Sequence, residues 1–217
     1  MKRILLYFML FLPLFSLAQS NSSIIKIGKL VLEGRKSFYF SKGDSSASLI
    51  IDTLIMKDKS KLFFTNKKKI NLVVNHAQIG KDCVIFGTDG KNNGTDLNLS
   101  MNFIALKSLY INVSGEEAKI ANRHFDNGNG GQVVLNYVSG GKKPQTTDKR
   151  GAGYVSISNK AGGNLVNPQT DMAVIMDRLR NGTAGRPLGQ FPQGRVYSGN
   201  MGRDGKATIK AVSSLPN

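Results

Sequence analysis

Short apolar segments separated by small polar breaks recur through the first half of the chain. In SLIIDTLIMKDKSKLFFTNKKKINLVVNHAQIGKDCVIF, residues 48–86, the clusters LIM, LFF, INLVV and CVIF each have the length and β-rich composition of a strand. Leu54, Leu62 and Ile70 lie eight residues apart, and Ile79 follows nine residues later. This pattern predicts a series of short β-strands.

Three further segments, TDLNLSMNF, KSLYINVSG and GQVVLNYVSG, continue the strand pattern to residue 140. In the last two, apolar residues alternate with other residues, at Leu109, Ile111 and Val113 and again at Val133, Leu135 and Tyr137. A period of two places one face of each strand on the core. The closing stretch GRVYSGNMGRDGKATIKAV predicts two more short strands across a Gly-rich turn.

One stretch has a helical period. In NPQTDMAVIMDRLRNG the apolar residues at positions i, i+3, i+4 and i+7 are Met172, Ile175, Met176 and Leu179. Thr170 or Asp171 can cap the start, and Gly182 can end the helix. We therefore expect one amphipathic helix near residues 169–180, followed by a long surface loop, GTAGRPLGQFPQG.

Many short strands at this spacing indicate a solenoid or a sandwich. Three features favour the solenoid: dense apolar triplets, short strands, and Asn and Gly at the breaks. Asn and Gly are expected there because tight corners need residues in the left-handed backbone conformation. We predict an all-β fold: a small right-handed parallel β-helix with one C-terminal amphipathic helix, the alternative being a β-sandwich. The expected solenoid domain covers residues 19–145, and a C-terminal β-rich segment, 146–217, packs on the same core.

The strand run also resembles known proteins. Its segments DTLIMKDKSKLFF, INLVV, AQIGKDCVIFGTDGKNNGTDLNLSM, LKSLYINVSG and GNGGQVVLNY, within residues 48–140, are similar to uncharacterised exported bacterial proteins with parallel β-helix rungs and Gly/Asn-rich insertions. The resemblance implies no agreed activity.

The N-terminus, MKRILLYFMLFLPLFSLAQS, has the pattern of a signal peptide. Two basic residues precede an apolar run that is too short to span a bilayer comfortably, and small residues follow at the cleavage positions. We expect residues 1–18 to be removed, with no transmembrane segment in the mature chain. The protein would then be secreted, periplasmic or at the cell surface.

Charge narrows the expected partners. The full chain carries a formal net charge of +16 at pH 7. The basic excess lies in the two ends of the mature chain, 19–81 and 141–217, which flank a slightly acidic middle. An exported protein this basic attracts polyanions, and acidic glycan is the expected partner. Sequence-specific nucleic-acid binding is not expected, because no recognition helix or aromatic-and-basic strand motif is present.

Two lysine runs, KDKSK and NKKKI, are the densest in the chain. A row of cations on a regular β-surface suits a linear polyanion, so the predicted ligand-binding residues are Lys57, Lys59, Lys61, Lys67, Lys68 and Lys69. The alternative is that these lysines are only solvated and prevent an open sheet edge from pairing with another chain. Tyrosines are available to contact sugar rings, but the chain has no Trp.

Several Gly/Asn-rich loops superficially resemble ligand-binding motifs. DGKNNGTDLNLS, residues 89–100, has Lys91 and Ser100 where an EF-hand needs a ligand at the third position and Glu at the twelfth. In HFDNGNGGQVVLNY, residues 124–137, NGNGGQ lacks the Lys-Ser/Thr pair of a P-loop. We interpret both as structural turns, and we expect no metal and no cofactor.

Candidates for catalysis are few. The single cysteine, Cys83, lies in the apolar segment DCVIF and is expected to be buried. If the protein is a small lyase-like, polysaccharide-active enzyme, Asp126, Arg123 and His124 are the candidate catalytic residues. The favoured interpretation is a non-catalytic structural or adhesive module. A third alternative is an accessory subunit that docks a protein partner through its strand edges.

Overall fold

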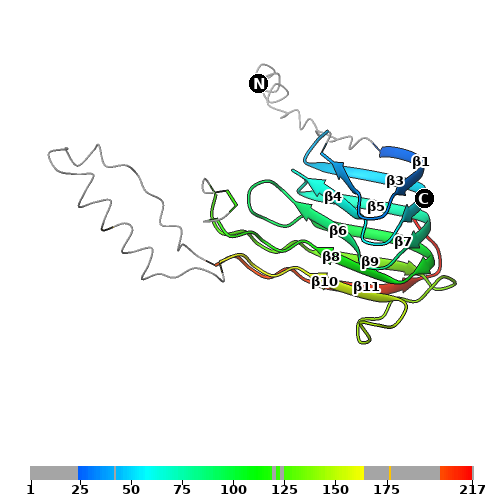
Figure 1. Ribbon diagram of the computed structural model, residues 1–217. Helices are drawn as coiled ribbons and strands as arrows, with labels where there is room; N and C mark the ends of the chain where they lie inside the picture. The colour runs from blue at the N-terminus through cyan, green and yellow to red at the C-terminus, as the bar shows by residue number, and fades with distance from the viewer. Residues whose placement is uncertain are drawn as a thin grey trace, which may run out of the picture.

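The computed structural model describes residues 24–41, 43–118, 121–122, 125–163, 176 and 201–216 (Figure 1). The predicted signal peptide, 1–18, lies outside the described residues. So does the predicted helix near 169–180, apart from Met176.

The strands form two parallel sheets. Sheet A contains, in spatial order, β1 (Ile24–Leu32), β3 (Ser46–Met56), β5 (Lys69–Ile79), β7 (Asp96–Leu106), β9 (Val133–Val138) and β11 (Ala207–Val212). Sheet B contains β2 (Ser37–Phe40), β4 (Lys61–Thr65), β6 (Cys83–Thr88), β8 (Ser108–Asn112) and β10 (Tyr154–Ser158). The chain alternates between the sheets, and every neighbouring pair of strands is parallel. This is a β-solenoid. The structure therefore confirms the predicted all-β parallel solenoid and not the alternative, a β-sandwich.

One turn of the solenoid contains two strands. Neighbouring partners in sheet A are 24 residues apart for Ile24 and Ser48, and 23 apart for Ser46 and Lys69. The separation then grows to 27 residues between β5 and β7, 36 between β7 and β9, and 74 between β9 and β11. The eight-residue spacing in the sequence therefore reflects the passage from β3 through β4 to β5 within one turn.

The core fills the space between the sheets with stacked apolar side chains. Sheet A contributes the register row Ile25, Leu49, Leu72, Leu99, Leu135 and Ile209. Sheet B contributes the row Phe38, Leu62, Ile85, Ile111 and Ile157. The interior members of both rows are buried, whereas their ends are only partly buried. Each turn thus needs its neighbours to cover its apolar face, which is the general property of a solenoid.

Most predicted strands are present, and three strands were not predicted. LIM, LFF, INLVV and CVIF fall in β3, β4, β5 and β6, as the apolar pattern predicts. The strands β1, β2 and β10 are additional. β2 and β10 have four and five residues, and they are defined by pairing with β4 and β8.

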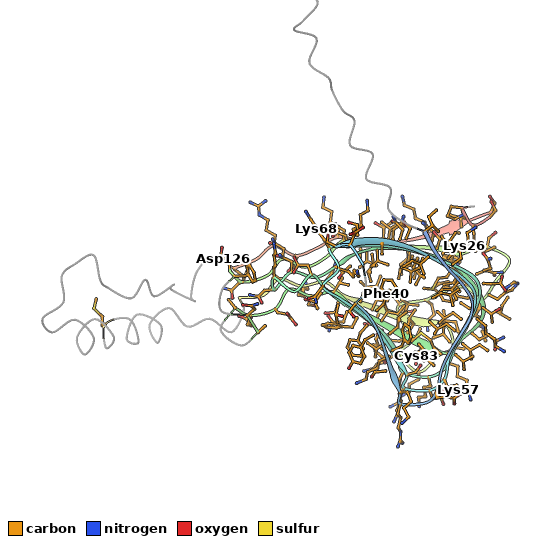
Figure 2. All side chains as sticks on the ribbon, turned by 90° about the horizontal axis from the view of Figure 1, so that it is seen from above. Lys26, Phe40, Lys57, Lys68, Cys83 and Asp126 are labelled. Carbon is orange, nitrogen blue, oxygen red and sulfur yellow. The ribbon has the colours of Figure 1, made fainter. Side chains whose placement is uncertain are left out.

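The longer turns form a Gly-rich extension, which we call the glycine arm: residues 92–94, 113–118, 127–131, 159–163 and 201–205 (Figure 2). Its segments are joined by backbone hydrogen bonds, such as Gly94 N to Asn129 O at 2.9 Å and Gly162 N to Gly128 O at 2.8 Å. The backbones pack so closely that a Cβ at Gly94 or Gly128 would overlap a carbonyl of a neighbouring segment. The glycines of NGNGGQ are therefore packing residues.

Candidate functional site

The turns that lead from sheet A to sheet B stack on one another and form one corner of the solenoid. Arg35 N donates to Asp58 O at 3.1 Å, and Lys59 N donates to Lys81 O at 2.7 Å. Ser108 N donates to Gly80 O at 3.1 Å, which continues the stack to the turn before β8. Successive turns are therefore spaced like strands in a sheet, by about 4.8 Å.

Basic residues occupy this corner in every turn. We call the following set the basic corner: Arg35, Lys36, Lys57, Lys59, Lys61, Lys81, Lys107, Lys149 and Arg150. Arg35 and Lys59 have φ of 62° and 61°, a left-handed conformation that turns the chain sharply between the sheets. Since each of these side chains is exposed, the corner presents a column of cations along the solenoid axis.

Four cations of the basic corner surround an open groove of about 710 Å³. Lys81 and Lys107 come from successive turns, and Lys149 and Arg150 come from the loop between β9 and β10. Tyr110, the middle residue of β8, also lines the groove. The convergence of four exposed cations on one groove produces a positive local field that favours anionic ligands.

Asp82 is the one carboxylate among the described residues of the groove lining. It is half-buried and has φ of 56°. Its backbone N–H donates to Ser108 Oγ at 2.6 Å, and Ser108 Oγ lies 3.3 Å from Asp82 Oδ1. These contacts fix Asp82 at the rim of the groove.

Acidic residues reduce the positive charge in the rest of the basic corner. Lys57 Nζ lies 2.7 Å and 2.9 Å from the carboxylate oxygens of Glu33. Asp58 Oδ1 accepts the backbone N–H of Lys81 at 2.7 Å, so this carboxylate stabilises the next turn. The basic excess of the corner is therefore strongest at the groove and at Lys59 and Lys61.

The structure separates the two predicted lysine runs. Lys57, Lys59 and Lys61 belong to the basic corner, whereas Lys68 lies at a different corner of the cross-section (Figure 2). Lys68 and Lys69 are exposed there, beside the start of β5. A single row cannot include both runs, because the chain crosses sheet B between them.

Lys67 has an interior position. It is 0% exposed, and its Nζ donates to the carbonyl oxygens of Gly43 at 3.0 Å and Asp44 at 2.6 Å. The ammonium also lies 5.4 Å from the centre of the Phe40 ring. The side chain therefore stabilises the turn before β3 and is not available to a ligand at the surface.

The candidate catalytic residues are only partly described. Asp126 is exposed in the loop that leads into the glycine arm, and its carbonyl accepts a hydrogen bond from Asn92 Nδ2 at 3.0 Å. Arg123 and His124 lie outside the described residues. Their catalytic role stays a prediction.

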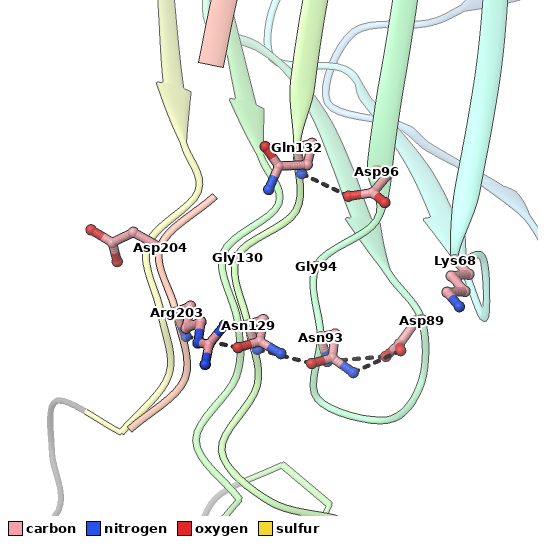
Figure 3. Close-up of a pocket in the computed structure, with 10 residues that line it drawn as sticks. All are labelled: Lys68, Asp89, Asn93, Gly94, Asp96, Asn129, Gly130, Gln132, Arg203 and Asp204. Atoms are coloured by element: carbon pink, nitrogen blue, oxygen red, sulfur yellow. Dashed lines mark hydrogen bonds between the residues drawn. The ribbon is translucent and has the colours of Figure 1, made fainter. Parts of the chain in front are cut away.

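A second hollow, of about 370 Å³, lies along the glycine arm (Figure 3). Its polar side chains form a ladder: Asn93 N donates to Asp89 Oδ1 at 3.0 Å, Asn129 N to Asn93 Oδ1 at 2.9 Å, and Arg203 N to Asn129 Oδ1 at 2.7 Å. Asp89 thus accepts a backbone N–H within its own loop, whereas Asn93 and Asn129 each accept the backbone N–H of the next turn, so all three side chains have a structural role.

The acidic residues of this hollow also have protein partners. Asp96 Oδ1 accepts Gln132 N at 2.8 Å, and a hydrogen bond from Lys160 to Asp204 at 2.9 Å lowers the pKa of that carboxyl. Among the described residues no three His, Cys, Asp or Glu side chains are grouped to hold a metal ion. We therefore place the candidate site at the basic corner.

Cys83 is buried, as expected, at 0% exposure. Its Sγ lies 3.3 Å from Lys57 O and 3.5 Å from Met56 O, and burial raises the pKa of the thiol above its ordinary value. Because the thiolate is the reactive form, we predict no reaction with a thiol reagent such as DTNB in the native state and full reaction in denaturant. Rapid labelling of native protein would contradict the burial of this side chain.

The sequence did not predict the four basic residues of the groove as ligand-binding residues: Lys81, Lys107, Lys149 and Arg150. A signal for part of the corner exists, because Arg35 and Lys59 are one turn apart at 24 residues, as are Lys57 and Lys81. The loop residues Lys149 and Arg150 carry no such period. Their place beside Lys81 depends on the stacking of β10 on β8.

Among the described residues no helix is long and apolar enough to cross a membrane. Comparison of the chain with protein-family models, with curated proteins and with solved structures finds no match.

Proposed function

We propose that this is an exported, non-catalytic module that binds acidic polysaccharide through the basic corner. The observation that carries the proposal is the groove at which Lys81, Lys107, Lys149 and Arg150 converge beside Tyr110. These cations come from three separate parts of the chain, and the solenoid brings them to one surface.

The geometry of the corner favours a linear ligand. Its cations are repeated along the solenoid axis at the spacing of strands in a sheet, about 4.8 Å. An acidic polysaccharide is a chain of repeating anionic groups, so it can contact several turns at once. Each contact between exposed charges is weak. Several contacts on one polymer chain give tighter binding, because the first contact raises the effective concentration of the polymer's other anionic groups at the remaining cations.

The first test is retention of the chain from residue 19 onward on immobilised polygalacturonate across a salt series. We expect retention at low salt and elution as salt rises, because exposed charges are screened beyond a Debye length. The released sugar is measured in parallel. Cleavage of the polymer would favour the lyase-like alternative and direct attention to Asp126, Arg123 and His124.

A variant that removes the groove cations provides a sharper test. We predict that Lys81→Gln, Lys107→Gln, Lys149→Gln and Arg150→Gln, combined, weaken binding to polygalacturonate at least about tenfold in about 0.1 M salt. The matched control combines Lys26→Gln, Lys29→Gln, Lys206→Gln and Lys210→Gln, which remove the same charge from exposed positions outside the corner.

The comparison separates a site from a general effect of net charge. Binding measured by titration calorimetry should fall strongly in the groove variant and only slightly in the control. Equal losses in the two variants would show that the overall charge is responsible, and unchanged binding in the groove variant would refute the proposed site.

The accessory-subunit alternative has one observation in its favour. β1 is the outer strand of sheet A, and its Ile24 and Val31 are 58% and 39% exposed. An exposed strand edge with apolar side chains is a surface on which another strand can pair. Concentration-dependent association of the protein, measured by sedimentation, together with no retention on the glycan, would favour this alternative.

A further inference from the structure

The groove of the basic corner contains two groups that a purely electrostatic site does not need. One is the carboxylate of Asp82, placed among four cations. The other is the ring of Tyr110, half-buried on the outer face of sheet B. Both belong to the wall of the groove, so they bear on which polyanion it accepts.

Asp82 disfavours ligands that carry anionic groups but no hydrogen-bond donors. A carboxylate only accepts hydrogen bonds, and it repels phosphate oxygens, which are also acceptors. A sugar polymer differs because each ring carries hydroxyl donors between its anionic groups. A ligand of this kind can place its anions on Lys81 and Lys107 and donate a hydroxyl to Asp82.

Tyr110 adds an apolar surface with a polar end. Its ring lies 5.8 Å from the ring of Tyr154 at an interplanar angle of 67°. The register of sheet B places Tyr110 beside Val84, so a small apolar side chain extends the apolar surface formed by the two aromatic rings. A sugar ring has C–H groups that pack against such a surface, whereas a polyphosphate chain has none.

A second aromatic group on sheet B has a different arrangement. Tyr39 and Phe63 are stacked, with centroids 4.7 Å apart and an interplanar angle of 9°, and Phe63 also contacts Phe86. The faces of Tyr39 and Phe63 pack on each other, whereas the rings of Phe63 and Phe86 are tilted by 55°. Both contacts join successive strands and so stabilise the stacking of the turns. None of the three lines the groove, so they provide internal controls.

We propose that Asp82 and Tyr110 form a sugar-ring subsite, which makes the groove selective for a polymer of acidic sugars, such as a hexuronate chain, over polyanions without sugar rings. This inference rests on the proposed function, because the four cations must first attract the polymer. It deepens that function by naming the ligand class and the two residues that discriminate.

The test compares two probes, polygalacturonate and inorganic polyphosphate, on single variants. Tyr110→Leu should weaken polygalacturonate binding about fivefold and change polyphosphate binding less than about twofold. Phe63→Leu removes a ring outside the groove and should leave both affinities unchanged. Leu keeps an apolar side chain but is smaller than either ring, so thermal melts check that each variant is folded.

Asp82→Asn gives changes of opposite sign. The substitution removes a negative charge and a strong acceptor, so we expect about threefold weaker binding of polygalacturonate and about twofold tighter binding of polyphosphate. Asn tolerates the left-handed conformation of this position, so the backbone should not be strained. A general loss of stability would weaken both interactions together and could not produce this crossover.

The outcomes separate the two proposals. If Tyr110→Leu and Asp82→Asn affect both probes equally, or neither, the sugar-ring subsite is refuted while binding at the corner stands. If the groove variant that lacks four cations still binds polygalacturonate as the wild type does, the proposed function itself fails. Tighter binding of both probes by Asp82→Asn would show that the groove responds to charge alone.

Discussion

Substitution of Gly128 by Ala is expected to lower the free energy of unfolding by about 3 kcal/mol or more. A Cβ at this position would overlap the carbonyl oxygen of Asn92, a backbone atom that cannot rotate away. Gly128 N also donates to Glu116 O at 3.0 Å, and its carbonyl accepts from Gly162 N. Any shift that relieves the overlap must therefore break hydrogen bonds to other segments of the glycine arm.

The measurement is urea unfolding followed by circular dichroism, with Gly140→Ala as the matched control. Gly140 has no atom within 4 Å of its Cβ position, so we expect that variant to change stability by less than about 0.5 kcal/mol. Equal midpoints for the two variants would show that the glycine arm does not contribute to the cooperative unit.

Replacement of Lys67 by Ala is expected to cost about 3 kcal/mol, an unusually large value for a lysine. The side chain is fully buried, so the substitution leaves a cavity where its stem packed. It also removes the hydrogen bonds to the carbonyls of Gly43 and Asp44. The turn that leads into β3 then loses its anchor to the following turn.

The neighbouring Lys68→Ala is the control, since Lys68 is exposed and should tolerate the change within about 0.5 kcal/mol. Lys67→Met keeps the buried volume and removes only the ammonium, so about 1 to 2 kcal/mol should be lost. Equal stability of Lys67→Ala and Lys68→Ala in the same urea titration would refute the buried position of Lys67.

The sequence alone predicts the fold class well, for a physical reason. Short apolar clusters such as LFF and CVIF have the length of strands, and their spacing leaves room only for tight turns. The structure places these clusters in β4 and β6 with their apolar positions on the core. Burial of Cys83 follows from the same local pattern.

The sites are less predictable, because composition does not reveal which way a turn faces. Lys67, Lys68 and Lys69 are identical in type and adjacent in sequence, yet one is buried and two are exposed. The difference arises from the left-handed Asn66, φ 58°, and from the carbonyls of Gly43 and Asp44 in the preceding turn, 24 and 23 residues earlier along the chain. A run of identical residues therefore does not indicate that one of them is buried and has a structural role.

What the sequence by itself determined is the local content of this protein: strands of a given length, a basic excess, and Gly-rich insertions without a complete ligand motif. What only the tertiary structure decided is which distant residues meet. Arg150 lies beside Lys81 because β10 pairs with β8 and β8 pairs with β6. These contacts depend on the summed length of each turn and its insertion. The register between turns is set by their backbone hydrogen bonds together with the stacked apolar rows of the core.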